Sequence, residues 1–197
     1  TRDGGATWTN VAPNIAGAPA FSWVSSVEAS SADAGTAWVA VDQHRMDDFA
    51  SYAFVTRDFG ETWTPVGHGL RGYVHVVRED PRQPGLLYAG TELGVFTSFD
   101  SGRSWTDLRL GLPHLAVRDL KVHPRDNDLV IATHARGFYV LDDVTPLQRL
   151  AEARARPVEL FPPLPPVRPR AAAGVPAAAP AGVGRGYGRS PGITGYA

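Results

Sequence analysis

An eight-residue pattern occurs three times in this chain and constrains its fold more than any other feature. The copies are Thr1–Trp8, Thr56–Trp63 and Ser98–Trp105, and each reads Ser/Thr-x-Asp-x-Gly-x-Thr/Ser-Trp. Copies of one short pattern along a chain indicate repeated supersecondary units. In each copy the Asp can accept hydrogen bonds from the backbone of its own turn, and the Gly supplies the positive φ that a tight turn needs. The pattern therefore predicts a turn that leads, through its Trp, into an outgoing strand and buries a large aromatic face.

The spacing of the copies defines the length of the repeat. Their Asp residues lie 55 and then 42 positions apart. Val74–Asp100 aligns with Val117–Asp143 without a gap at an offset of 43, and Val24–Val41 fits the same template at an offset of 50. An eight-residue insertion between Asp42 and Tyr52 explains the longer first spacing. One unit is therefore about 43 residues, which suits four short strands with tight connections.

Short apolar segments separated by turn residues follow the same order in each unit, as expected for strands. No amphipathic helical period occurs before residue 145, so this part is predicted to be all-β. The expected strands are Val74–Val77, Leu86–Ala89, Val95–Ser98 and Trp105–Leu108 in one unit, and Val117–Val122, Leu129–Ala132 and Phe138–Leu141 in the next.

The repeated pattern resembles the Asp-box, or BNR repeat, of β-propellers of the sialidase, sortilin and xyloglucanase type, over roughly residues 1–145. The resemblance implies a partial β-propeller of about three four-stranded blades. In that family the box lies at the turn between the third and fourth strands of a blade, so its Asp is structural rather than catalytic or metal-binding. The structural box positions here are Asp3, Gly5, Trp8, Asp58, Gly60, Trp63, Asp100, Gly102 and Trp105.

The sequence changes character after residue 145. Pro146 stands where a helix can begin, Thr145 is a candidate N-cap, and Leu147 and Leu150 supply an apolar stripe, which predicts a short exit helix over 146–156. From residue 157 the chain is rich in Pro, Ala, Gly and Arg. Few large apolar residues remain there to offset the cost of ordering the chain, so we expect a disordered linker over 157–197.

The first copy of the pattern stands at the first residue, and three blades are fewer than the roughly four of a closed ring. We therefore expect the C-terminal part of a larger propeller, whose partners include the remaining blades of a longer protein. The resemblance implies an exported protein, extracellular or periplasmic.

Composition argues against several classes of function. The formal net charge is −1 and no stripe of Lys and Arg is present, so nucleic acid is not an expected partner. No apolar run approaches the length of a membrane span. The absence of cysteine excludes disulfides and thiol catalysis within these residues. We expect no cofactor and no metal.

Blade geometry sorts the polar residues between two rims. The box turns lie on one rim, and the loops between second and third strands, with the links between blades, lie on the other. In sialidases and related propeller hydrolases, ligands bind at this second face. We place there the insertion 42–52, the loops 91–94 and 134–137, and the links near His68 and His114. The predicted ligand-binding residues are His44, Arg45, Asp47, Asp48, Glu92, His134 and Arg136.

The insertion is the strongest local candidate because it places five ionisable groups within seven residues of a longer loop. Three hypotheses remain open for it. Arg45 pairs with Asp47 or Asp48 and stiffens the loop; or the loop binds a ligand, including a cation, although it lacks EF-hand spacing. In the third, Asp47 or Asp48 works with Glu92 as a catalytic pair, which requires carboxylates about 5–10 Å apart.

Residues 132–143, which read Ala-Thr-His-Ala-Arg-Gly-Phe-Tyr-Val-Leu-Asp-Asp, resemble the final blade of bacterial BNR proteins labelled glycosyl hydrolase or sortilin-like. The resemblance places His134 and Arg136 on the candidate face, where an arginine can meet a carboxylate or a sugar hydroxyl. Arg45 and Arg136 do not by themselves establish the arginine triad of sialidases. His75 and His123 fall near strand ends, and we assign them no chemistry.

These observations favour a non-catalytic β-propeller segment that binds a carbohydrate or a protein partner on the face opposite the boxes. The alternative is part of a propeller glycoside hydrolase of the sialidase or xyloglucanase type, with its remaining catalytic residues outside this chain. A third possibility is a purely structural segment that completes a ring.

Overall fold

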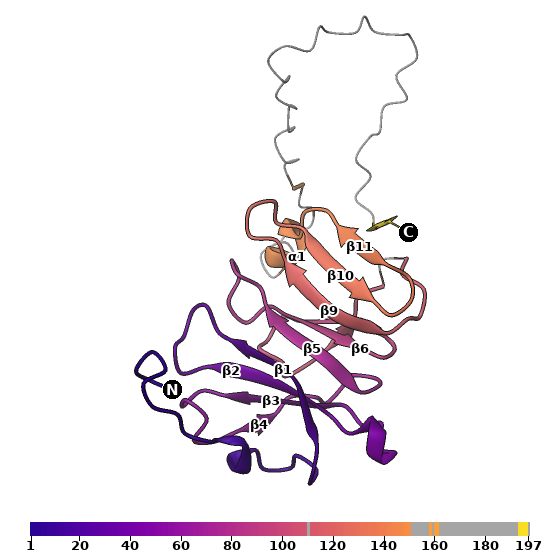
Figure 1. Cartoon of the computed structure of the whole chain (residues 1–197). Coiled ribbons are helices and arrows are strands. Elements are labelled where there is room, and N and C mark those ends of the chain that lie inside the picture. The colour runs from indigo at the N-terminus through magenta and orange to yellow at the C-terminus, as the bar shows by residue number, and fades with distance from the viewer. Residues whose placement is uncertain (110, 151–157, 159, 162–192, 197) are drawn as a thin grey trace, which may run out of the picture.

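The computed structural model describes residues 1–109, 111–150, 158, 160–161 and 193–196. These residues form three four-stranded antiparallel sheets (Figure 1). The first sheet holds β1 (Trp23–Ala29), β2 (Ala37–Asp42), β3 (Tyr52–Thr56) and β4 (Thr64–Pro65). The second holds β5 (Val74–Glu79), β6 (Leu87–Thr91), β7 (Gly94–Ser98) and β8 (Thr106–Asp107). The third holds β9 (Val117–Val122), β10 (Leu129–Thr133), β11 (Phe138–Leu141) and β12 (Ile193–Tyr196).

The three sheets pack face to face in chain order, so the chain is an all-β partial β-propeller, as the repeat predicts. The first strand of the second sheet, β5, contacts both β1 and β9, which places the first strands of the blades side by side (Figure 1). None of the helices in the part of the chain that the structure describes is long and apolar enough to cross a membrane.

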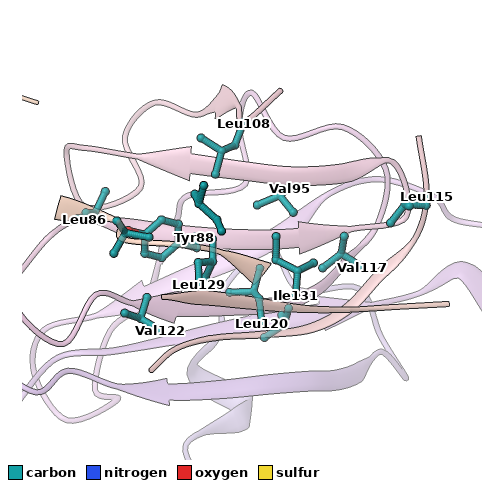
Figure 2. Close-up of a cluster of buried hydrophobic side chains, with 13 residues drawn as sticks. Leu86, Tyr88, Val95, Leu108, Leu115, Val117, Leu120, Val122, Leu129 and Ile131 are labelled. Carbon is teal, nitrogen blue, oxygen red and sulfur yellow. The ribbon is translucent and has the colours of Figure 1, made fainter. Parts of the chain in front are cut away.

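Two apolar layers hold the blades together. Trp38 and Val55 of the first sheet meet Val77 and Phe96 of the second. Between the second and third sheets lies the larger layer shown in Figure 2, which includes the following fully or almost fully buried side chains: Tyr88, Val95, Val117, Leu120, Leu129 and Ile131. Each such side chain contributes about 1.5–3 kcal/mol by leaving water.

The register of the sheets corrects the gap-free alignment of the second and third units. Val77 pairs with Ala89, whereas Leu120, its equivalent at an offset of 43, pairs with Ile131. The turn between β9 and β10 is one residue shorter than its counterpart in the second sheet, and the loop between β10 and β11 is one residue longer. The two changes cancel in the sequence. Leu129–Ala132 of β10 are apolar at every position, so the sequence shows no alternation that would reveal the shift.

The eight-residue motif forms the same hydrogen-bonded turn in all three copies, as predicted. In the second copy Asp58 accepts hydrogen bonds from the amide of Thr62 at 2.9 Å, from its hydroxyl, and from the Thr56 hydroxyl at 2.8 Å. Asp3 and Asp100 have equivalent partners. The hydrogen bonds of Thr62 lower the pKa of Asp58 to about 2. Gly60 has a φ of 88°, in the region that favours glycine.

The Trp rings of the motif are less buried than the pattern predicts. Trp8 is 78% exposed, so for this residue the prediction of a large buried face is wrong. Trp63 and Trp105 are half-buried, and the Trp105 indole donates to the carbonyl of Val66 in the preceding sheet at 2.6 Å. Burial of the ring depends on what the neighbouring sheet presents to it, which the motif does not specify.

The exit helix begins one residue earlier than predicted. Helix α1 spans Thr145–Gln148, so Thr145 is its first residue, and Val144 is the N-cap. Residues 151–156 of the predicted helix lie outside the described residues. Gln148 donates from Nε2 to both carboxylate oxygens of the buried Asp80, at 2.9 and 3.0 Å, and to Asn127. This network ties α1 to the second sheet.

Strand β12 lies within the segment predicted as a linker, and for these four residues that prediction is wrong. Ile193–Tyr196 pairs with β11 and gives the third sheet its fourth strand. The unpaired edge of β11 offers the hydrogen-bonding groups for this pairing, and composition gives no sign of such an edge. Most of 157–192 lies outside the described residues, and there the linker remains a prediction.

Candidate functional site

The first strand of every sheet carries a β-bulge at the same position of the repeat. In β1, Val24 and Ser26 pair with consecutive residues of β2, which leaves Ser25 without a partner. The same register shift leaves out His75 in β5 and Arg118 in β9. A bulge bends the strand and redirects a side chain, and bulges are enriched beside functional sites. Ser25, His75 and Arg118 are called the bulge residues below.

The three bulge residues converge on one pocket of about 370 Å³, called here the bulge pocket. Its volume lies within the range of small-ligand sites. The segment before β1 and the insertion after β2 supply the rest of its wall, which includes Phe21, Trp23, Asp42, His44 and Arg45.

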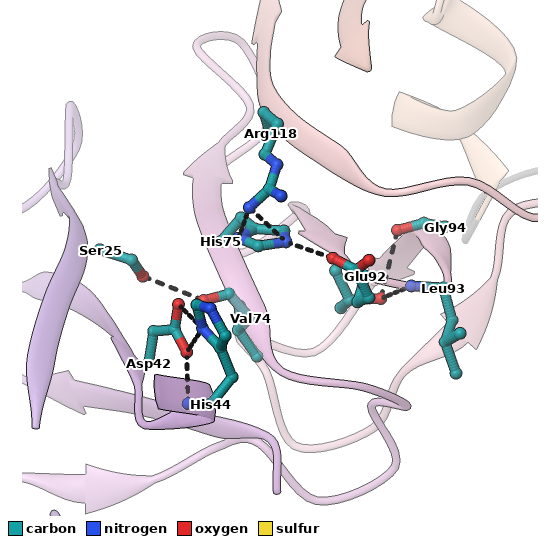
Figure 3. A network of polar contacts seen from close by, with 10 residues as sticks. Ser25, Asp42, His44, Val74, His75, Glu92, Leu93, Gly94 and Arg118 are labelled. Atoms are coloured by element: carbon teal, nitrogen blue, oxygen red, sulfur yellow. Dashed lines mark hydrogen bonds and ion pairs between the residues drawn. The ribbon is translucent and has the colours of Figure 1, made fainter. Parts of the chain in front are cut away.

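His75 is the centre of a polar network between two blades (Figure 3). Its Nε2 lies 3.1 Å from Oε2 of Glu92, and Nη1 of Arg118 lies 3.3 Å from each ring nitrogen. The His75 and Tyr73 rings form a T-shaped contact, with centroids 4.9 Å apart and planes at 78°. A neutral imidazole can donate to Glu92 from Nε2 and accept from Arg118 at Nδ1.

The surroundings fix the charges of this network. Burial, with the positive charge of Arg118, outweighs the effect of Glu92 and holds the pKa of His75 below its ordinary value of 6.5. Burial acts to raise the pKa of Glu92, but hydrogen bonds from His75 and Tyr73 outweigh it and the pKa is lowered. Burial and the bond to Glu92 raise the pKa of Tyr73 to about 12. At neutral pH, His75 is therefore neutral and Glu92 is ionised.

His44, a predicted site residue, lies at this pocket and joins the insertion to the network. It belongs to the 3-10 turn η2 (His44–Met46) within the insertion. Its Nδ1 lies 2.7 and 2.8 Å from the two carboxylate oxygens of Asp42, which also accepts from the His44 backbone amide at 2.9 Å. The His44 ring stacks on Tyr73 at 4.5 Å and 16°.

Arg45 does not stiffen the loop through an acidic neighbour, which was the structural hypothesis for the insertion. Its guanidinium carbon lies 5.3 Å from the centroid of the Trp23 ring, a cation–π contact. Trp23 is 64% exposed and the adjacent Phe21 is 96% exposed. Two aromatic rings and a guanidinium therefore stand open at the rim of the bulge pocket.

Asp47 and Asp48 lie on the insertion but do not line the bulge pocket. Asp47 ends η2 in the left-handed region with a φ of 63°. Asp48 accepts from the Tyr52 hydroxyl at 2.8 Å and from the amide of Ala50 at 3.0 Å. The structure thus gives Asp48 a structural contact.

The other predicted residues surround a second, wider pocket of about 850 Å³. Glu92, His134 and Arg136 line it, together with His114 and Tyr139. The seven predicted residues divide between the insertion and this second pocket. Glu92 connects the two pockets because its carboxylate contacts His75. Among the described residues, no three His, Asp or Glu side chains are arranged to hold a metal ion.

Sequence reasoning missed three central residues, His75, Arg118 and Tyr73. A signal for two of them exists, because His75 and Arg118 are equivalent in the repeat and each is a polar residue directly after the valine that begins a first strand. This signal can be recognised only if a bulge is expected at that position. Without a bulge, a polar residue there would be interpreted as facing solvent.

No family model matches the chain, and no curated protein matches it by sequence. Among solved structures, an ancestral GH74 enzyme is similar with a TM-score of 0.50 and 18% identity, over 66% of this chain and 15% of that one. A GH74 enzyme of Niastella koreensis gives 0.49 and 17%, over 61% of this chain and 21% of its own. YCF48 bound to a D1 peptide gives 0.45 and 17%, over 63% and 38%. At these identities the likeness concerns the fold, and this chain spans less than two fifths of each of these neighbours.

Proposed function

We propose that this chain is a non-catalytic β-propeller segment that binds a carbohydrate or a protein partner through the bulge pocket. The observation that carries the proposal is the convergence of Ser25, His75 and Arg118, which come from the same bulge in three successive blades. A repeated scaffold feature thus brings three different polar side chains to one open pocket.

The contacts of the carboxylates favour binding over hydrolysis. Glycoside hydrolysis requires a carboxylic acid that gives up a proton near neutral pH, with a second carboxylate about 5–10 Å away. Glu92 has a lowered pKa, and Asp42 and Asp48 are both engaged by neighbouring donors. These groups orient other side chains rather than stand ready for a substrate.

The experiment measures binding of the purified chain to a glycan array and to a peptide library, together with release of reducing sugar. His75→Ala removes the centre of the network, and Arg125→Leu is the control because Arg125 pairs with Asp126 in the turn before β10. We expect binding that His75→Ala weakens and Arg125→Leu leaves unchanged, without hydrolysis. Sugar release that disappears in Glu92→Gln would establish the hydrolase alternative instead.

We further propose that the open face of the first sheet packs against another blade of a longer propeller. Val27 is 61% exposed, whereas its repeat equivalents Val77 and Leu120 are 0% and 2% exposed beneath the preceding sheet. Val11 packs on Gly60 as Val66 packs on Gly102, so the segment after the first motif already occupies the position of a preceding blade's outer edge.

The equivalent hydrogen bonds of the three motifs support their assignment as Asp-boxes. We also propose that the chain belongs to a BNR protein of the sortilin-like or glycosyl hydrolase-like type, and that this protein is exported to the periplasm or the cell exterior.

A further inference from the structure

The hydrogen-bonding capacity left over at the bulge pocket is mostly that of donors. Arg118 carries five N–H groups, and its contact in Figure 3 is with His75, a neutral ring that offers one acceptor nitrogen. Within the described part of the chain, Arg118 forms no ion pair at 4 Å or less. Its side chain is exposed and lines the pocket.

The acidic groups beside the pocket already have their partners. Asp42 accepts from the amide and the ring of His44, and Glu92 accepts from Nε2 of His75 (Figure 3). Asp42 and Glu92 thus already orient donors of the protein itself, whereas Arg118 retains several donors for a ligand's acceptors.

Arg45 adds a second cation to the same wall. Its guanidinium lies over the Trp23 ring, and this cation–π contact uses none of the guanidinium N–H groups as hydrogen-bond donors. These N–H groups can therefore bind a ligand in the plane of the guanidinium. Two guanidinium groups at one pocket, without a carboxylate bonded to either among the described residues, are suited to a carboxylate, which they can bind in bidentate fashion.

The aromatic part of the wall is held in place despite its exposure. Phe21 has a φ of 61°, which is unusual for a bulky residue and strains the backbone. The carbonyl of the adjacent Ala20 accepts a 3.0 Å hydrogen bond from the buried side chain of Gln43, and Ser22 donates to Pro19 at 2.7 Å. A strained, anchored and exposed aromatic beside an open pocket indicates a ligand-contacting surface.

We propose that the bulge pocket binds an acidic polysaccharide through a uronate residue. Arg118 and Arg45 hold the carboxylate, and the C–H face of the sugar ring packs on Trp23 or Phe21, where the aromatic quadrupole attracts it. This inference rests on the proposed binding function and specifies its ligand. The open aromatic rings favour a sugar over an acidic peptide, whose charged side chains need no flat apolar surface.

The test measures the affinity of the full chain by titration calorimetry for polygalacturonate, alginate and hyaluronan. Fully methyl-esterified polygalacturonate is the matched ligand without charge, and poly-L-glutamate is the matched polyanion without sugar. We expect at least tenfold tighter binding to an acidic polysaccharide than to the ester or to poly-L-glutamate.

The protein variants separate the two parts of the pocket. Arg118→Leu and Trp23→Ala should each weaken binding of the acidic polysaccharide about tenfold or more, Arg118→Lys should recover part of the loss, and Arg125→Leu should have no effect. The urea midpoint of each variant shows whether it is folded, and for a variant that does not fold, Arg45→Leu provides the same test.

Equal binding of the methyl ester would overturn the inference while leaving carbohydrate binding in place. Preference for poly-L-glutamate would overturn it in favour of a protein partner. Failure of all three acidic polysaccharides to bind folded protein would overturn it as well, and cleavage of the polymer would instead refute the non-catalytic function.

Discussion

Gly90→Ala tests the link between the packing of the blades and the geometry of the site. Gly90 lies in β6 and is buried between the second and third sheets. A Cβ atom there would lie 2.7 Å from Cγ1 of Val117, 2.8 Å from Cγ1 of Val76 and 3.0 Å from the Val117 carbonyl oxygen. Carbon atoms prefer separations of about 3.5–4.0 Å. The added methyl group is therefore about 1 Å too close to two β-branched side chains that have little freedom to rotate.

The magnitude follows from two opposing terms. Overpacking of this kind costs about 1–3 kcal/mol. Replacing Gly by Ala at an unstrained position returns about 0.4–1 kcal/mol by restricting the unfolded chain. We expect a net loss of about 1–2 kcal/mol, measured by urea unfolding as a lower midpoint with an unchanged slope.

The substitution should also change the geometry of the bulge pocket. Val117 and Val76 are the chain neighbours of Arg118 and His75, so separating β6 from β9 should lengthen the distance between His75 and Arg118. NMR titration of the His75 ring should then show a pKa closer to the ordinary value, because the ring becomes more hydrated and more distant from the guanidinium.

Two further variants distinguish a steric effect from a general one. Val117→Ala removes one of the crowded methyl groups, so the double variant with Gly90→Ala should be about 1 kcal/mol more stable than the sum of the single effects predicts. Gly94→Ala places its methyl group in open space and tests backbone strain alone at a φ of 140°. The tight approach of the blades would be refuted if Gly90→Ala were as stable as the original protein and its effect simply added to that of Val117→Ala.

Three other predictions follow from the contacts. Because the folded state lowers the pKa of His75, the unfolded chain binds more protons near pH 6.5, and the free energy of unfolding should fall as the pH drops through and below that value. Urea titrations at pH 7.5 and 5.5 should show that a His75→Gln variant loses this part of the pH dependence. Gln148→Ala should cost about 1–3 kcal/mol, because the fully buried Asp80 loses a donor to both oxygens; a change below 0.5 kcal/mol, against an exposed control such as Arg109→Ala, would contradict the role of α1 as an anchor. Trp105→Ala should cost about 2–4 kcal/mol, since it removes a half-buried ring and a hydrogen bond, whereas the exposed Trp8→Ala should change stability by less than about 0.5 kcal/mol; similar values for the two would show that the ring does not join the blades.

Local patterns were sufficient for the repeated turn and the strands. The Asp and Gly of each motif act within eight residues of chain, so their hydrogen bonds and positive φ depend on nearby sequence and are readable from it. The position of Glu92, His134 and Arg136 on one face follows from counting strands, since alternate connections in an up-and-down sheet lie at the same end.

The division of those residues between two pockets could not be predicted, because it depends on how far apart neighbouring blades lie. The compensating one-residue changes around β10 were hidden for a related reason. Val130 and Ile131 are both apolar, and either could face the second sheet until the pairing with β9 is known.

The sequence by itself determined an all-β repeat with its turns, its insertion and the rim that carries the polar loops, since each of these is encoded within one unit. Only the tertiary structure decided that three bulges meet, that His75 is neutral between Glu92 and Arg118, and that Arg45 lies over Trp23 rather than beside Asp47 or Asp48. Burial and neighbouring charges set those outcomes, and they arise from contacts between residues well separated in the chain, such as Arg118 and His75 at 43 positions and His75 and Glu92 at 17.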